Sequence, residues 1–124
     1  MRSSVRRDTT ILRGASGAYY GFTVFSLEES LPRAAGIYAL ATRIVGPEPW
    51  NILLIGETAN FAAELASPRS SAVNEAFRRC ATHVLLYVSP IATERRREAG
   101  QDVWRNVRSP LVAWDGEDVQ HRQA

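Results

Sequence analysis

Arginine is the residue type in this chain with the clearest chemical potential. All 15 basic residues are Arg, and the planar guanidinium suits paired hydrogen bonds to phosphate oxygens. Six of them gather on or beside two predicted helices: Arg69, Arg78 and Arg79 in one group, and Arg95, Arg96 and Arg97 in the other. These groups could contact phosphate, or they could form solvated helix faces paired with neighbouring glutamates. A codon bias towards Arg would explain the same composition.

Histidine and cysteine offer little further chemistry. The chain has one cysteine, Cys80, and two histidines, His83 and His121. These three residues give neither a disulfide nor the ligand spacing of a zinc site. Cys80 lies in an apolar helical stripe, and His83 begins an apolar strand, so structural roles are the simpler interpretation for both.

The composition indicates one small globular domain. The chain has 124 residues, of which 45% are hydrophobic and 23% charged, enough for one core but not for two. Its net charge of +2 permits a nucleic-acid partner without requiring one. The basic N-terminus lacks the apolar stretch of a secretory signal, and no apolar run is long enough to span a membrane as a helix. A cytoplasmic protein without a membrane partner is therefore expected.

Four segments carry the alternating or continuous apolar pattern of β-strands: residues 18–26, 36–45, 51–56 and 83–89. The second and third are separated by Gly46-Pro47-Glu48-Pro49, a loop short enough to return the chain as an antiparallel hairpin. The segment 111–114 could add a short edge contact. We expect a flexible N-terminal arm over residues 1–14, a domain over 15–110 and a tail over 111–124.

Three helices should position the polar residues. The first covers residues 61–65 with Thr58 or Asn60 as its N-cap, and the second runs from Ser70 or Ser71 to Cys80. The third spans residues 93–108. Its apolar stripe comprises Ala99, Val103, Trp104 and Val107.

Two short motifs stand on the predicted hairpin, Gly36-Ile37-Tyr38 and Leu54-Ile55-Gly56. With the following Gly56-Glu57-Thr58-Ala59-Asn60-Phe61, they resemble the paired motifs of the GIY-YIG nuclease family, over about residues 17–110. The resemblance implies an α+β fold with a small antiparallel sheet of three to four strands flanked by helices, here with an extra N-terminal strand. It also implies cleavage of a phosphodiester with one divalent ion such as Mg²⁺.

The positions that correspond to the family's site are mostly changed. Tyr38 matches the first catalytic tyrosine, whereas Leu54 stands where a second tyrosine is expected. Glu64 takes the place of the phosphate-binding arginine, a charge reversal worth ~4 kcal/mol for a close pair at an effective dielectric of ~20. The metal-binding glutamate falls near Gly100 or Gln101, flanked by Glu98 and Asp102. Tyr38 could also simply fill a sheet face, and Gly36 and Gly56 could serve turns and close packing.

Three functions remain open from the sequence. The first is a degenerate endonuclease that binds DNA or RNA, or another partner, without cleaving it. The second is an active Mg²⁺-dependent DNA endonuclease with relocated residues, namely Glu98 or Asp102 as metal ligand and Arg78 or Arg79 as phosphate clamp. The third is a protein-binding domain, with a protein partner or a second copy contacting the apolar face around Leu54. Only the second function requires a metal.

Overall fold

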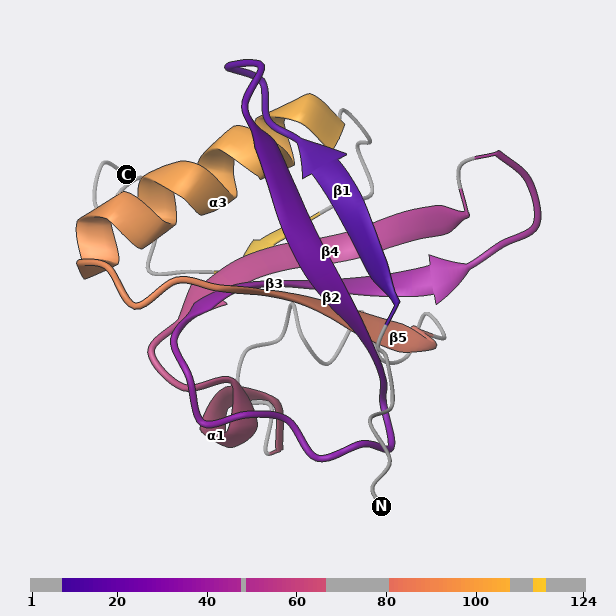
Figure 1. Ribbon diagram of the computed structural model, residues 1–124, viewed down its shortest axis with the longest axis horizontal. Coiled ribbons are helices and arrows are strands. Elements are labelled where there is room, and N and C mark those ends of the chain that lie inside the picture. The colour runs from indigo at the N-terminus through magenta and orange to yellow at the C-terminus, as the bar shows by residue number, and fades with distance from the viewer. Residues whose placement is uncertain (1–7, 48, 67–80, 108–112, 116–124) are drawn as a thin grey trace.

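The computed structural model describes residues 8–47, 49–66, 81–107 and 113–115. These residues form, in chain order, β1 (Thr9–Arg13), β2 (Tyr19–Ser26), β3 (Gly36–Arg43), β4 (Trp50–Thr58), α1 (Phe61–Ala66), β5 (His83–Val88), α3 (Thr93–Val107) and β6 (Ala113–Asp115) (Figure 1). The predicted α+β class is confirmed. The helix predicted to end at Cys80 lies outside the described residues.

All six strands belong to one sheet with the order β1-β2-β5-β3-β4-β6. Neighbouring strands are antiparallel except for β4 and β6, which are parallel. The sheet is strongly twisted, so that β1 and β2 cross β3 and β4 at a steep angle in Figure 1. Strand β3 lies in the middle, between β5 and β4, and carries the first of the two sequence motifs.

The sheet has six strands, whereas the sequence predicts three to four strands and an extra N-terminal strand. Strand β1 lies within residues 1–14, where a flexible arm was expected. Thr9–Arg13 forms a strand because its antiparallel pairing with β2 satisfies backbone N–H and C=O groups that so short a segment cannot satisfy alone. Strand β6 matches the edge contact expected after Pro110. It pairs with β4 through Leu54, Ile55 and Gly56.

The predicted hairpin of β3 and β4 is confirmed, and Tyr38 pairs with Gly56 across it. Its loop contains Gly46 at a φ of 134°, a conformation that favours glycine. The Ile44 amide donates to the Pro49 carbonyl at 2.7 Å and closes the loop. The hairpin therefore holds the two motifs side by side.

A β-bulge changes the alternation of β4. The pairing passes from Leu40 opposite Leu54 to Ala41 opposite Ile52, so that Leu53 has no partner across the hairpin. As a result Leu53 and Leu54 both join the cluster on one side of the sheet, although they are adjacent in sequence. A regular strand would place them on opposite faces.

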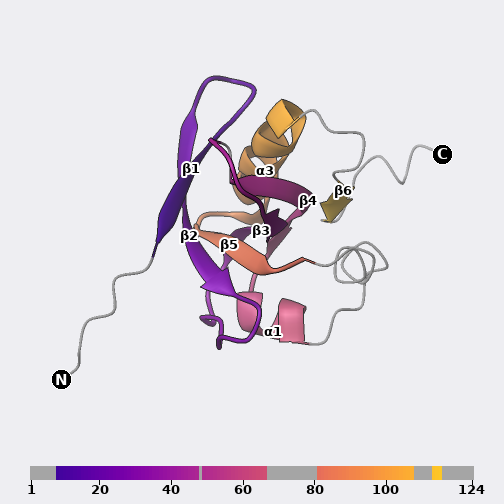
Figure 2. The ribbon, with the colours of Figure 1, turned by 90° about the vertical axis from the view of Figure 1, so that its right-hand side faces the viewer.

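The two helices cover opposite faces of the sheet (Figure 2). Phe61 of α1 packs with Tyr38, Leu40 and Leu54. Val103 of α3 packs with the opposite side of the same strands, together with Ala99, Trp104 and Val107, which confirms the predicted apolar stripe. Neither of these described helices is long and apolar enough to span a membrane.

Candidate functional site

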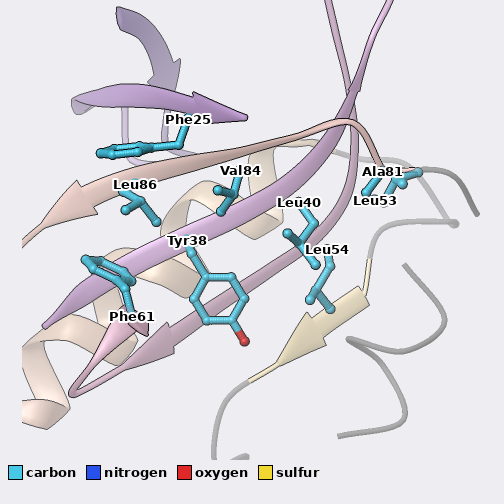
Figure 3. Close-up of a cluster of buried hydrophobic side chains, with 9 residues drawn as sticks. All are labelled: Phe25, Tyr38, Leu40, Leu53, Leu54, Phe61, Ala81, Val84 and Leu86. Atoms are coloured by element: carbon cyan, nitrogen blue, oxygen red, sulfur yellow. The ribbon is translucent and has the colours of Figure 1, made fainter. Parts of the chain in front are cut away.

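Tyr38 lies in the core. It is 0% exposed and shares a cluster with Leu54, Phe61 and other apolar side chains (Figure 3). Leu54, at the position of the family's second tyrosine, is also 0% exposed. The sequence suggests an apolar contact surface around Leu54, but the Leu54 side chain is buried and offers no exposed surface.

Glu64 lies on the same side of the sheet as Tyr38 because it belongs to α1. Its backbone amide donates to the Asn60 carbonyl at 3.0 Å. Of the two predicted N-cap residues, Asn60 caps the helix: its side-chain oxygen accepts from the Ala63 amide at 3.3 Å. Thr58 supports this turn by accepting from the Asn60 amide at 3.2 Å. Glu64 is half-buried.

Asp102 lies on α3, across the sheet from Tyr38, and fastens this helix to the β1–β2 hairpin. Its Oδ1 accepts from the Ser16 amide at 2.8 Å, and its Oδ2 accepts from the Ser16 hydroxyl at 2.7 Å and the Tyr20 hydroxyl at 2.8 Å. A Cβ on Gly14 would collide with the Asp102 carboxylate, so glycine is required for this close approach. These contacts occupy both carboxylate oxygens.

The same contacts shift two ionisations. Burial raises the pKa of Tyr20, and the Asp102 hydrogen bond and charge raise it further, to about 12. Burial alone would raise the pKa of Asp102 as well. The hydrogen bonds from Ser16 and Tyr20 outweigh that effect and hold the pKa below its ordinary value. The pair therefore consists of a charged carboxylate and a neutral phenol over the whole neutral range.

A magnesium ion would not fit the two α3 carboxylates that the sequence offers as its ligands, Glu98 and Asp102. Asp102 is engaged by Ser16 and Tyr20, and Glu98 is exposed on the surface. Among the residues that the structure describes, no three His, Cys, Asp or Glu side chains form a group that could hold a metal ion. Both carboxylates also belong to the helix on the face opposite Tyr38.

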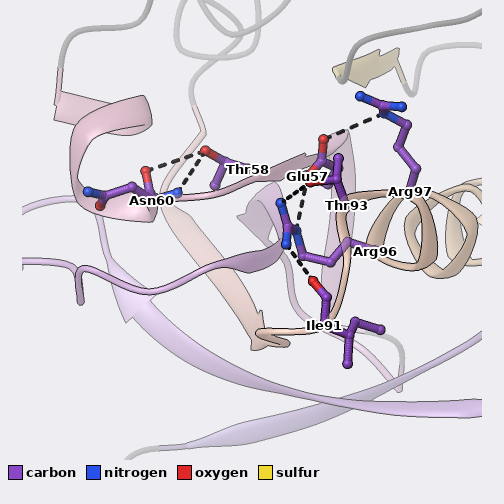
Figure 4. A network of polar contacts seen from close by, with 7 residues as sticks. All are labelled: Glu57, Thr58, Asn60, Ile91, Thr93, Arg96 and Arg97. Carbon is purple, nitrogen blue, oxygen red and sulfur yellow. Dashed lines mark hydrogen bonds and ion pairs between the residues drawn. The ribbon is translucent and has the colours of Figure 1, made fainter.

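The run Arg95–Arg97 is not a uniformly solvated helix face, because Arg96 is buried. Its side chain is 7% exposed and donates from Nε to Glu57 Oε2 at 3.1 Å (Figure 4). Nη1 donates to the Ile91 carbonyl at 2.6 Å and Nη2 to the Thr93 hydroxyl at 3.1 Å. Arg97 Nε lies 3.8 Å from the other oxygen of Glu57.

Glu57 and Arg96 therefore form a buried ion pair between β4 and α3, which the sequence interpretation missed. A signal for it existed in the sequence. Arg96, Gly100 and Val103 have the i, i+4, i+7 spacing of one helix face, and all three are buried. Of the arginines proposed to hold phosphate, Arg78 and Arg79 lie outside the described residues.

A groove of about 580 Å³ opens on the α3 side of the sheet, between β1 and the start of β4. From β1 it is lined by residues 10–13, from β4 and the loop before it by Pro47, Pro49, Trp50, Asn51 and Ile52, and from the end of α3 by Asn106 and Val107. Arg13 is the one charged residue among these described lining residues. The Asn106 side chain donates to the Arg13 carbonyl at 2.9 Å and fixes that end of β1.

Trp50 connects this groove to a small polar and aromatic cluster. The guanidinium of Arg43 lies 5.1 Å from the centre of the indole ring, and the His83 ring packs edge-on at 5.1 Å. His83 Nδ1 also lies 2.8 Å from the Thr82 hydroxyl. These neighbours hold Trp50 at the groove wall, half-buried.

Comparison of the chain with protein-family models, with curated proteins and with solved structures gave no match.

Proposed function

We propose that the chain is a GIY-YIG-like domain that binds nucleic acid without cleaving it. The observation that carries the loss of cleavage is the position of Tyr38. A residue that activates water must reach both the water and the phosphate, whereas Tyr38 is 0% exposed in an apolar cluster. The carboxylates considered as metal ligands belong to the helix on the other face of the sheet.

The order of elements is compatible with the family's scaffold. The two motifs lie on the adjacent strands β3 and β4, and α1 follows β4 directly. Strand β5 then pairs with β3, and α3 follows it. The resemblance in sequence implied this succession of hairpin, helix, strand and helix.

Binding is supported by the groove between β1 and β4. Trp50 lies in its wall, and the Arg43 guanidinium lies 5.1 Å from the centre of the indole ring. An aromatic ring beside an arginine is a combination that proteins use to hold nucleic-acid strands. An active nuclease would instead need its tyrosine, arginine and metal ligand on one accessible surface.

Incubation of the protein with supercoiled plasmid and Mg²⁺ or Mn²⁺ tests the absence of cleavage. We expect the plasmid to stay supercoiled. Robust nicking that disappears in Tyr38→Phe would contradict the proposal, because it would show that Tyr38 still acts on phosphate.

Titration of fluorescent oligonucleotides tests the binding half. We expect an affinity that falls as salt rises, because displaced counterions accompany each phosphate contact. No binding to DNA or RNA at low salt would contradict this half and would favour a protein partner.

A further inference from the structure

We propose that the free edge of β1, which forms one wall of the groove between β1 and β4, binds an extended peptide segment of another protein as an additional strand of the sheet. The segment carries apolar side chains towards the groove and an acidic side chain opposite Arg13. This inference goes beyond the proposed function and does not depend on it. A strand paired with β1 and a nucleic acid at Trp50 would exclude each other from the groove.

Two backbone hydrogen bonds show which way the peptide groups of β1 point. The Val24 amide donates to the Asp8 carbonyl at 2.9 Å, and the Gly14 amide donates to the Ala18 carbonyl at 2.7 Å. The residues immediately before and after β1 therefore direct these backbone groups towards β2.

The odd-numbered residues of β1 direct their backbone groups the other way, because successive residues of an antiparallel strand bond to opposite sides. The N–H and C=O groups of Thr9, Ile11 and Arg13 thus point away from β2. In the part of the chain that the structure describes, no strand pairs with this side of β1. The Asn106 side chain donates to the Arg13 carbonyl at 2.9 Å. The edge presents donors and acceptors at every second residue, a spacing that the backbone of another strand matches.

The lining of the groove places this edge in its wall. Four consecutive residues of β1, Thr10–Arg13, line the groove, although alternate side chains of a strand point to opposite faces. Leu12 packs on the α3 side of the sheet, so the side chains of Ile11 and Arg13 lie on the other face. These two residues reach the groove with their backbone. The wall is therefore the strand edge itself, which selects an extended backbone as its ligand.

Strand β1 lacks the features that keep unused edges from pairing. Thr9–Arg13 contains no proline and pairs with β2 without a bulge. The opposite wall, formed by the start of β4 and the loop before it, leaves a space of about 580 Å³, the size of a small-ligand pocket. A single strand fits such a space, whereas the folded body of a second copy does not.

The two faces of β1 determine the side chains of the segment. The groove side offers Leu12 and Trp50, and the only charged residue of the described lining, Arg13, has its side chain on the other face. On that outer face Ile11 is 60% exposed, and Arg13 lies opposite Tyr19. A carboxylate on the added strand opposite Arg13 would form a cross-strand charge pair. The matching segment alternates apolar side chains towards the groove with acidic, β-branched and polar side chains on the outer face.

The test uses the capped peptide Gly-Glu-Leu-Val-Leu-Thr-Gly, whose antiparallel pairing with β1 places its valine opposite Ile11 and its glutamate opposite Arg13. Nuclear magnetic resonance of the ¹⁵N-labelled protein follows the binding. The Ile11 amide should shift and exchange more slowly with water when the peptide binds. The Leu12 amide, which points towards β2, should be protected with and without peptide.

Substitutions at the edge separate backbone pairing from side-chain contact. Ile11→Pro removes the N–H that faces the peptide and leaves the bonds to β2 intact, so it should weaken binding about tenfold or more. Ile11→Ala keeps the backbone groups and should retain most of the affinity. Arg13→Glu should reverse the preference, so that a peptide with lysine in place of glutamate binds more tightly than the original.

Methylation of the peptide backbone tests the same hydrogen bonds without altering the protein. A methyl group on the valine nitrogen, which faces β1, should abolish binding. A methyl group on the nitrogen of the preceding leucine, which faces away from β1, should leave the affinity unchanged. Circular dichroism and urea denaturation of each protein variant identify any loss of affinity that comes from unfolding.

Four results would overturn the assignment. They are an Ile11 amide that does not respond to about 1 mM peptide, and equal binding of the two methylated peptides. The third is an Ile11 amide that is protected in the protein alone, together with a dimer in sedimentation velocity, which would assign the edge to a second copy. The fourth is protection of that amide by a 12-nucleotide single strand but not by the peptide. These measurements need no nucleic-acid affinity, so failure of the proposed function would leave a peptide site intact.

Discussion

At the residue scale, the buried pair of Glu57 and Arg96 is the contact most sensitive to substitution. Both side chains are 7% exposed, and removal of one partner leaves the other charge buried without compensation. We expect Glu57→Ala to lower the free energy of unfolding by about 3 kcal/mol, near the lower end of the usual range because Arg96 keeps its contacts with Ile91 and Thr93. Urea denaturation measures this change. Glu98→Ala removes an exposed carboxylate from the helix that carries Arg96, and it should change the free energy of unfolding by less than ~0.5 kcal/mol. Equal effects of the two substitutions would contradict the assignment of Glu57 and Arg96 as a buried ion pair.

Gly36 makes the second prediction at this scale. A Cβ at this position would collide with the Tyr87 carbonyl and approach Cζ of Phe61 to 2.7 Å. Gly36→Ala should therefore destabilise the fold by about 1–3 kcal/mol, as overpacking does in other cores. Gly21→Ala, where the nearest atom to the new Cβ lies at 3.9 Å, provides the control in urea denaturation. If Gly36→Ala and Gly21→Ala lower the free energy of unfolding equally, packing does not require glycine at position 36.

At the element scale, the β1–β2 hairpin and α3 are joined by the hydrogen bond from Tyr20 to Asp102. The pKa of Tyr20 is raised to about 12 from an ordinary value of 10, so the folded state holds the phenolic proton more tightly than the unfolded chain. This contribution is complete below pH 10 and is lost as pH rises towards 12. Two pKa units set an upper limit of about 2.7 kcal/mol, which we expect partial exposure of Tyr20 to reduce to roughly 1 kcal/mol.

Tyr20→Phe tests this prediction. The variant should be less stable than the wild type at neutral pH by about 1 kcal/mol, and the difference should shrink between pH 10 and 12. Thermal unfolding across this range measures it. The lowered pKa of Asp102 acts at the opposite end: its contribution is present above its ordinary pKa and is lost as pH falls through the lowered value. A constant difference between wild type and variant from pH 7 to 12 would mean that Tyr20 does not carry the shift.

At the scale of the whole molecule, the net charge of +2 predicts that nucleic-acid binding depends on a few local contacts instead of a broad cationic surface. For single strands, log Kobs against log salt has a slope of about −0.7 per phosphate, so one or two phosphate contacts give a slope of about −0.7 to −1.4. Titration at four or more salt concentrations measures the slope. A slope near −4 would contradict a site limited to one or two phosphate contacts and would indicate a wider arginine surface.

The sequence by itself determined the local elements. Alternating apolar residues gave β2, the loop of Gly46 and Pro47 gave the hairpin of β3 and β4, and the stripe of Val103 and its neighbours gave the buried face of α3. These features depend on periodicity and turn chemistry over a few residues, which a linear sequence records directly. The edge strand β1 was missed because its structure comes from pairing with β2, and nothing in its five residues requires it.

The tertiary structure alone decided which residues share a surface. The bulge opposite Leu40 places Leu53 and Leu54 on the same side of β4, and the two helices on opposite faces separate Tyr38 from Asp102. The groove joins β1, β4 and the end of α3, so that Arg13 and Trp50, which are 37 positions apart, line one space. Such juxtapositions follow from the twist of the sheet and from packing on both of its faces, and residue spacing along the chain does not contain that information.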